Sequence, residues 1–175
     1  MPDSVSIIGR GTFQGCSKLK TVKIPESVAQ IGEEAFAECS SLDSICIPES
    51  VREIDSRVFR NCRIKNIKHK NLEIRDGFEI RINSDEDISL ISNTDDSRME
   101  IVVPEYITSI DEYAFSNSST LEKISFAKPE IKTDSRGVFS NCKALKEFNF
   151  PLSMQVIPWE YFDRCSSLEI TTIPD

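Results

Sequence analysis

The amino-acid sequence predicts a solenoid, a fold in which one short structural unit is repeated and stacked. Three residue types recur at intervals of 23, and the first members of each series are Phe13, Phe36 and Phe59, Cys16, Cys39 and Cys62, and Pro2, Pro25 and Pro48. A fixed interval between about 20 and 50 residues is typical of repeat architectures. Because six copies can be read along the 175 residues, we expect a curved stack of about six coils.

Each copy closes on the pattern Leu-x-x-Ile-x-Ile-Pro, which is clearest at residues 42–48. The alternating apolar pair indicates a short, half-buried β-strand, and the proline ends the strand because it cannot donate to a neighbouring one. The pattern occurs once per copy, so we expect one parallel strand in each coil. Stacking the coils then buries each apolar column on itself, because a single coil cannot bury its own apolar side.

A turn is expected in the middle of each copy. Gly32, Asp55 and Asp111 share one column, and these residue types suit either a turn or the N-cap of one helical turn. Acids such as Glu33 follow this column, where the positive end of a helix dipole would favour them. The turn is expected to end before Cys39.

Five of the six cysteines occupy one apolar position per coil: Cys16, Cys39, Cys62, Cys142 and Cys165. An even number of cysteines can indicate a disulfide framework, but one cysteine at the same apolar position of each coil is explained more simply by burial. A zinc site is not expected, because zinc needs close pairs of ligands, which are absent here. We therefore expect these five to be reduced and buried as small hydrophobic side chains, with neither metal nor cofactor. Cys46 lies between Ile45 and Ile47 and should face outward.

The repeat is interrupted between Phe59 and Phe115. These two residues are 56 positions apart, ten more than two copies require, and the phenylalanine and cysteine columns are missing between them. Residues 78–82 and 88–91 alternate in polarity around the polar stretch 83–87, which predicts an inserted β-hairpin with a turn of about five residues. We therefore divide the chain into a repeat block at 1–69, an irregular coil with the hairpin at 70–98, and a second repeat block at 99–175. The segment from Lys70 to Glu100 contains nine acidic and four basic residues, a composition typical of a solvated surface.

The repeat Ile-Pro-Glu-Ser-Val-x-x-Ile-Gly-x-x-Ala-Phe-x-x-Cys-x-x-Leu, best kept at residues 24–47, resembles the BspA-like leucine-rich repeat, also called the Treponema pallidum type. The hairpin that begins at residues 76–78 is similar to the irregular inserts of that family. The fifth copy departs from the pattern at 128–134, and the sixth has Pro158 and Trp159 in its turn. The resemblance implies a right-handed leucine-rich-repeat solenoid that acts in adhesion or protein binding at the cell surface or in secreted form.

Catalysis is not expected, because common nucleotide-binding, hydrolase and metalloprotease motifs are absent. The single histidine, His69, falls at the end of a strand and is expected to be a partly buried structural residue. The formal charge of −8 and pI near 4.8 argue against a nucleic-acid partner, which requires clustered Lys and Arg. No basic amphipathic helix or long apolar run indicates membrane contact.

Binding is expected on the surface that repetition creates. Outward positions of successive strands should align into a polar stripe, formed by Thr21, Lys23, Ser44, Cys46, Asn66, Lys68, Lys123, Ser125, Glu147 and Asn149. Solenoids use such extended faces for binding, so we expect a protein or glycan ligand, including host extracellular ligands. The alternative is an intracellular scaffold, which the reduced cysteines favour.

The ends of the sequence lack atypical capping copies. The first residues are already in the repeat, and Pro174 and Asp175 begin another copy. Because repeat arrays usually carry caps, we expect a segment of a longer array. The alternative is a short chain whose uncapped ends associate with other copies.

Overall fold

The computed structural model describes residues 1–55 and 57–172, which form thirteen β-strands connected by turns and contain no helix. The chain divides into two compact units, Met1–Arg81 (unit 1) and Ile82–Asp175 (unit 2). Pro174 and Asp175, which were expected to begin a further copy, lie outside the described residues.

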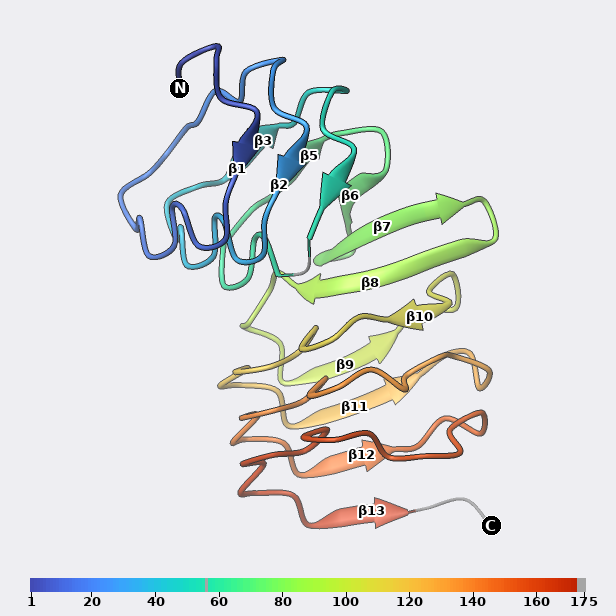
Figure 1. Ribbon diagram of the computed structural model, residues 1–175. Coiled ribbons are helices and arrows are strands. Elements are labelled where there is room, and N and C mark those ends of the chain that lie inside the picture. The colour runs from blue at the N-terminus through green and yellow to red at the C-terminus, as the bar shows by residue number, and fades with distance from the viewer. Residues whose placement is uncertain (56, 173–175) are drawn as a thin grey trace. The chain divides into compact units, whose positions relative to one another are not determined.

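Unit 1 begins with three coils that carry two sets of parallel strands (Figure 1). Strands β3 (Ser44–Cys46) and β5 (Asn66–Lys68) pair in parallel, which confirms the strand expected from the Ile-x-Ile-Pro pattern. A second set, β1 (Ile7–Ile8), β2 (Gln30–Ile31) and β4 (Glu53–Ile54), forms a parallel sheet in that order. These two-residue strands are too short to show alternation in the sequence.

Unit 1 ends in an antiparallel pair formed by β6 (Leu72–Arg75) and the start of β7 (Phe78–Ser84). Asp76 and Gly77 connect the strands and both have positive φ, 54° and 78°. Two central residues of positive φ define the type I′ turn, whose twist matches that of the flanking strands. The Asp-Gly dipeptide is therefore the local cause of this reversal.

Unit 2 also contains a continuous parallel sheet, seen as a row of arrows in Figure 1. Its strands are β9 (Glu100–Val103), β11 (Lys123–Phe126), β12 (Glu147–Asn149) and β13 (Ile170–Thr172). Adjacent strands are one coil apart in the sequence and hydrogen-bond in parallel. Strand β8 (Asp87–Asn93) pairs in parallel with β10 (Ser109–Ile110).

The turn between β7 and β8 contains two residues, Asp85 and Glu86, rather than the expected five. The polar residues on both sides continue the strands, and the side-chain amide of Asn83 donates to a carboxylate oxygen of Asp87 at 3.3 Å. Strand β8 is buried and does not project into solvent, because Leu90 and Ile91 are 0% and 2% exposed. The hairpin therefore contributes to the core.

The middle of each coil is a run of turns, which confirms a turn at these positions and excludes the helical turn. The chain adopts a left-handed backbone two residues before and two residues after each phenylalanine of the repeat. The positions are Gly11, Gly15, Glu34, Glu38, Arg57, Asn61, Tyr113, Asn117, Gly137, Asn141, Glu160 and Arg164. Left-handed residues reverse the chain tightly and break any helix. Only three of these twelve positions are glycine, so composition does not reveal them.

The phenylalanine column forms the centre of each stack. Phe36 is fully buried, and its ring stacks on Phe13 at 5.1 Å and on Phe59 at 5.9 Å. In unit 2, Phe139 stacks in the same way on Phe115 at 5.2 Å and on Phe162 at 5.9 Å. These contacts confirm that an interval of 23 or 24 residues places equivalent side chains directly on one another.

The cysteine column is only partly buried as expected. All six cysteines are free, and Cys39, Cys62 and Cys142 are buried, but Cys16 is exposed and Cys165 is half-buried. The buried thiols donate to the phenylalanine carbonyl of the preceding coil, for example from Cys62 to Phe36 at 2.9 Å. Within the described residues no coil stacks on the other side of Cys16, which is exposed, so the expectation of burial was wrong there. Cys46 is exposed, as expected.

Candidate functional site

The strand face of unit 1 presents the predicted outward residues of β3 and β5 to solvent. Ser44 lies beside Asn66 and Cys46 beside Lys68 in the parallel register. All four are exposed, whereas Ile45 and Ile67, between them, are 5% and 6% exposed. Alternation along each strand separates this polar face from the core.

Thr21 and Lys23 lie outside any strand, although sequence reasoning placed them on one. Both are nevertheless exposed, with Val22 half-buried between them and Ile24 buried after them. The first coil therefore keeps the alternation of its neighbours without the backbone pairing. These two residues extend the polar surface of β3 and β5 to the first coil.

The strand face of unit 2 differs in charge, because its lysine is neutralised within the sheet. Lys123 lies in register with Glu100 on one side and Glu147 on the other. Its ammonium is 2.7 Å from the Glu147 carboxylate, and this hydrogen bond raises the pKa of Lys123. Ser125 and Asn149 complete the predicted set; Ser125 is half-buried and Asn149 exposed.

Two outward residues of β9 were missed by sequence reasoning. Glu100 and Val102 are both exposed and lie in register with Lys123 and Ser125. The signal was present, since residues 101–104 read Ile-Val-Val-Pro, which keeps the Ile-x-Ile-Pro pattern with valine as its second apolar residue. The interrupted copy before them hid the repeat.

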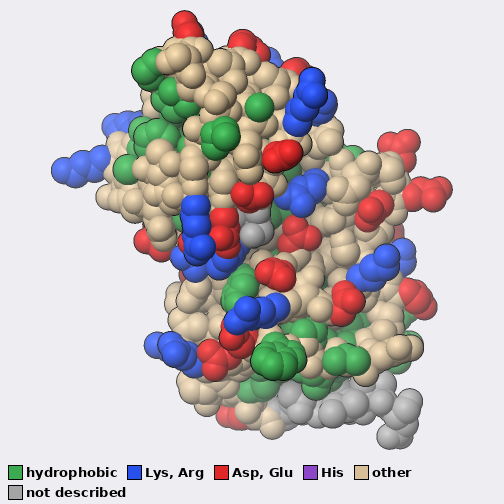
Figure 2. Space-filling model, in the orientation of Figure 1, with side chains coloured by type: hydrophobic (Ala, Val, Ile, Leu, Met, Phe, Trp, Pro, Cys, Tyr) green, Lys and Arg blue, Asp and Glu red, His purple; other side chains and the backbone are tan. Residues whose placement is uncertain are grey.

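The two units also differ in overall charge. Unit 1 carries 13 Lys and Arg against 12 Asp and Glu, whereas unit 2 carries 8 against 17. Acidic side chains gather around the tip of the β7–β8 hairpin (Figure 2), where Asp85 and Glu86 form the turn. Both turn residues are exposed, so the acidic tip is the second candidate surface.

The turn side of unit 1 carries a network of ion pairs across three coils, formed by Arg10, Glu33, Glu34, Glu38, Arg57 and Arg60. Glu34 lies at its centre, 8% exposed, with Arg57 and Arg60 at 3.4 Å and 3.3 Å. A buried carboxylate requires such partners to offset its loss of hydration. The three arginines and three glutamates of the network balance in charge, which gives it a structural explanation.

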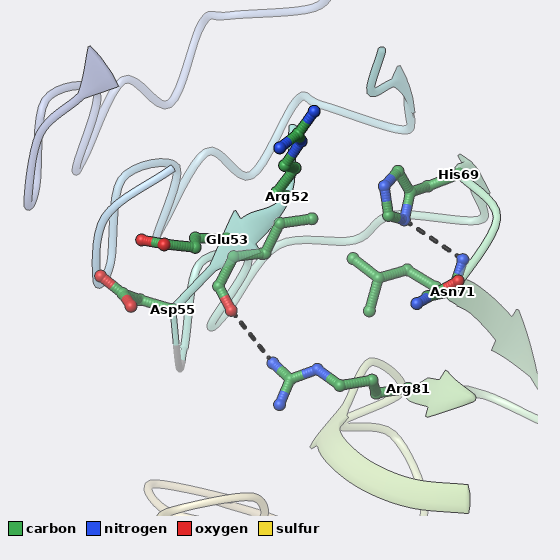
Figure 3. Close-up of a pocket in the computed structure, with 8 residues that line it drawn as sticks. Arg52, Glu53, Asp55, His69, Asn71 and Arg81 are labelled. Atoms are coloured by element: carbon green, nitrogen blue, oxygen red, sulfur yellow. Dashed lines mark hydrogen bonds between the residues drawn. The ribbon is translucent and has the colours of Figure 1, made fainter. Parts of the chain in front are cut away.

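A cavity of about 410 Å³ opens beside β4 in unit 1 (Figure 3). Its walls are formed by Arg52, Glu53, Ile54, Asp55, His69, Asn71, Leu72 and Arg81. The guanidinium of Arg81 donates to the carbonyl oxygen of Ile54 at 3.2 Å, so this side chain caps the edge of the short sheet. Cations and carboxylates are mixed around the cavity, which gives it no single preferred ligand charge.

His69 is half-buried at one wall of this cavity, as expected for a structural histidine. Its Nδ1 accepts a hydrogen bond from the backbone nitrogen of Asn71 at 3.3 Å. Burial lowers the pKa of His69, because a charged imidazolium is poorly solvated there. The neutral ring therefore serves as a hydrogen-bond acceptor in the chain reversal before β6.

Residues 1–55 and 57–172 contain no helix with the length and apolarity that a membrane span requires. Over the same residues, no three His, Cys, Asp or Glu side chains are grouped closely enough to hold a metal ion.

A family model described as the BspA type leucine rich repeat region matches residues 1–77 and 92–175, in six copies. The unmatched residues 78–91 are those of the hairpin formed by β7 and β8. A search of curated proteins finds no match.

Among solved structures, the chain is similar to a leucine rich cell surface protein from Faecalibacterium prausnitzii A2-165, with 27% identity and a TM-score of 0.78. All of this chain aligns with 47% of that one, so it spans about half the length of that relative. The pneumococcal vaccine antigen PcpA has 24% identity and a TM-score of 0.65, with 90% of this chain aligned to 40% of that one. At this identity, the likeness to PcpA concerns the fold alone.

Proposed function

Because the chain belongs to the BspA-type leucine-rich repeat family, we propose that it is a non-catalytic interaction module that binds a protein or glycan through its strand faces. One observation carries the proposal: outward side chains such as Lys68 are exposed, while their strand neighbours such as Ile67 are buried. A face built this way can vary its side chains without disturbing the core. Extended faces of stacked repeats are commonly used for binding.

We place the module in a cell-surface or secreted protein. The support is the likeness, at 27% identity, to a leucine rich cell surface protein. The second candidate is an intracellular scaffold, favoured by the six free cysteines, since thiols stay reduced most readily inside cells. Expression of the native gene, followed by protease shaving of intact cells and detection of the released fragment, distinguishes the two.

The binding proposal is tested on arrays of extracellular proteins and glycans. A probe that binds the wild-type chain is measured again with Lys23→Glu/Lys68→Glu and with the control Lys128→Glu/Lys132→Glu, which changes the charge equally in unit 2. We expect weaker binding for the first variant only. Unchanged circular dichroism and melting temperature would show that both variants fold.

The acidic tip is the rival site. Replacing the whole of residues 78–91 would remove buried side chains such as Phe78, Ile80 and Leu90, so the test uses Asp85→Asn/Glu86→Gln. These two side chains are exposed at the turn, and the substitutions remove charge while keeping shape. If this change abolishes binding and the lysine change does not, the strand-face assignment is wrong.

A further inference from the structure

On the strand face of unit 1, two rows of basic side chains flank a row of small ones. The first coil contributes Lys18, Lys20 and Lys23, and the third contributes Arg63, Lys65 and Lys68; we call these the basic rows. The second coil contributes the central row, Ser41, Asp43, Ser44 and Cys46. All ten side chains are exposed.

Backbone pairing aligns the rows of the second and third coils, and the first coil stacks on the second through its turn. Cys46 pairs with Lys68, and the nitrogen of Lys65 donates to the carbonyl of Asp43 at 2.8 Å, so the second and third coils are in register. The first and second coils are joined by bonds such as Phe13 nitrogen to Ala35 oxygen at 2.7 Å. Paired chains lie about 4.8 Å apart, so the row of the third coil is the direct neighbour of the central row. The side chains of the central row are shorter than the lysine and arginine side chains of the basic rows.

The six cations of the basic rows are not used within the protein. In the described chain, none of them forms a salt bridge, whereas in unit 2 Lys123 pairs with Glu147 and Lys146 with Glu122. The acids next to this face are Asp43 in the central row, Glu26 and Glu49, and the last pairs with Lys70 at 3.6 Å. The face therefore has an excess of positive charge within a chain of net charge −8.

We propose that this face binds a linear anionic polysaccharide, with sulfate or carboxylate groups on the basic rows and sugar hydroxyls against the central row. The inference rests on the proposed function and names its ligand class. Two parallel rows of cations suit a polymer whose charges lie on both sides of its axis. The hydroxyls of Ser41 and Ser44, in the central row, suit the sugar ring oxygens and hydroxyls between those charges.

An acidic protein segment fits this face less well. Protein interfaces depend on apolar or aromatic anchors in pockets, and the exposed large hydrophobic side chains of unit 1 are Met1 and Ile7, which lie outside the three rows. Addition of a peptide strand would use an edge of the two-stranded sheet of β3 and β5, whereas the charged side chains of the three rows stand on its face. Single-stranded nucleic acid would need aromatic stacking platforms, which the three rows lack.

The test measures binding of a heparin dodecasaccharide by isothermal titration calorimetry. The variant Lys20→Glu/Lys23→Glu/Lys68→Glu should bind at least about tenfold more weakly than the wild type, since each reversed contact removes an attraction and adds a repulsion. The control Lys128→Glu/Lys132→Glu/Lys143→Glu has the same net charge and should bind within about threefold of the wild type. Neutral dextran should not bind, and dextran sulfate should.

Three outcomes overturn the inference: no heparin binding by the wild type, an equal loss in both variants, or equally tight binding of polyglutamate of matched charge. The last would assign the face to acidic proteins. These failures are distinguishable from failure of the proposed function. If heparin does not bind, but an uncharged partner from the arrays does bind and depends on Lys23 and Lys68, the strand-face proposal stands and the polysaccharide is excluded.

Discussion

The hydroxyl of Tyr113 donates to Oε2 of Glu160 at 3.0 Å, across the coil that lies between them. Gly137 occupies the intervening position, and a Cβ built there would lie 2.3 Å from the Tyr113 ring. Arg136 binds the same carboxylate at 2.6 Å and 3.2 Å. The hydrogen bond from Arg136, with that from Tyr113, lowers the pKa of Glu160. The missing side chain at residue 137 thus lets one tyrosine connect three coils of unit 2.

Gly137→Ala should therefore destabilise the protein by about 1 to 3 kcal/mol, because it adds both a ring clash and an unfavourable φ of +60°. Gly15→Ala is the matched control, since Gly15 has φ of +73° but nothing within 4 Å of its added Cβ. Urea unfolding should show the larger loss for Gly137→Ala. Equal losses would mean that the contact with Tyr113 is unimportant.

Phe36→Ala should lower the free energy of unfolding by about 3 to 5 kcal/mol. The ring is fully buried and stacks between Phe13 and Phe59, so its removal leaves a cavity that two neighbouring coils cannot close. Phe13→Ala, at a half-buried position, is expected to cost less. An unchanged melting temperature for Phe36→Ala would show that the column is not the core.

Thiol titration with an aromatic disulfide reagent should distinguish the cysteines by exposure. Cys16 and Cys46 should react at once, Cys165 more slowly, and Cys39, Cys62 and Cys142 only after denaturant is added. Burial also raises the pKa of Cys62 and Cys142 to about 12, so the reactive thiolate is scarce at neutral pH. Rapid reaction of all six thiols in the native protein would refute the burial of the column.

The same two thiols predict a loss of stability in alkali. Their pKa is raised in the folded state, so the unfolded chain loses these protons first, near 9, and their contribution to stability declines as the pH rises from 9 to about 12. The free energy of unfolding of the wild type should fall more steeply over this range than that of Cys62→Ala/Cys142→Ala. If the free energies of unfolding of the two proteins fall equally steeply with pH, Cys62 and Cys142 are not the cause of the loss.

The period of the apolar columns was legible in the sequence because stacking places equivalent residues on one another. Phe13, Phe36 and Phe59 must recur at a constant interval if their rings are to touch, and the interval therefore predicted the coils, the parallel strands and the exposed alternation of Ser44 and Cys46. These features depend only on the spacing of residues within a coil and from one coil to the next.

Other features depend on which coils are neighbours, and only the tertiary structure decided them. Cys16 has the sequence context of Cys39, yet it is exposed, because within the described residues a neighbouring coil lies on one side of it only. Tyr113 adopts a φ of 58° that its residue type does not favour, and its backbone nitrogen donates to the carbonyl of Arg136 in the next coil. The basic rows likewise exist only when the first and third coils are aligned on the second. Burial, strain and shared surfaces are properties of contacts between coils, and a single copy of the repeat does not contain them.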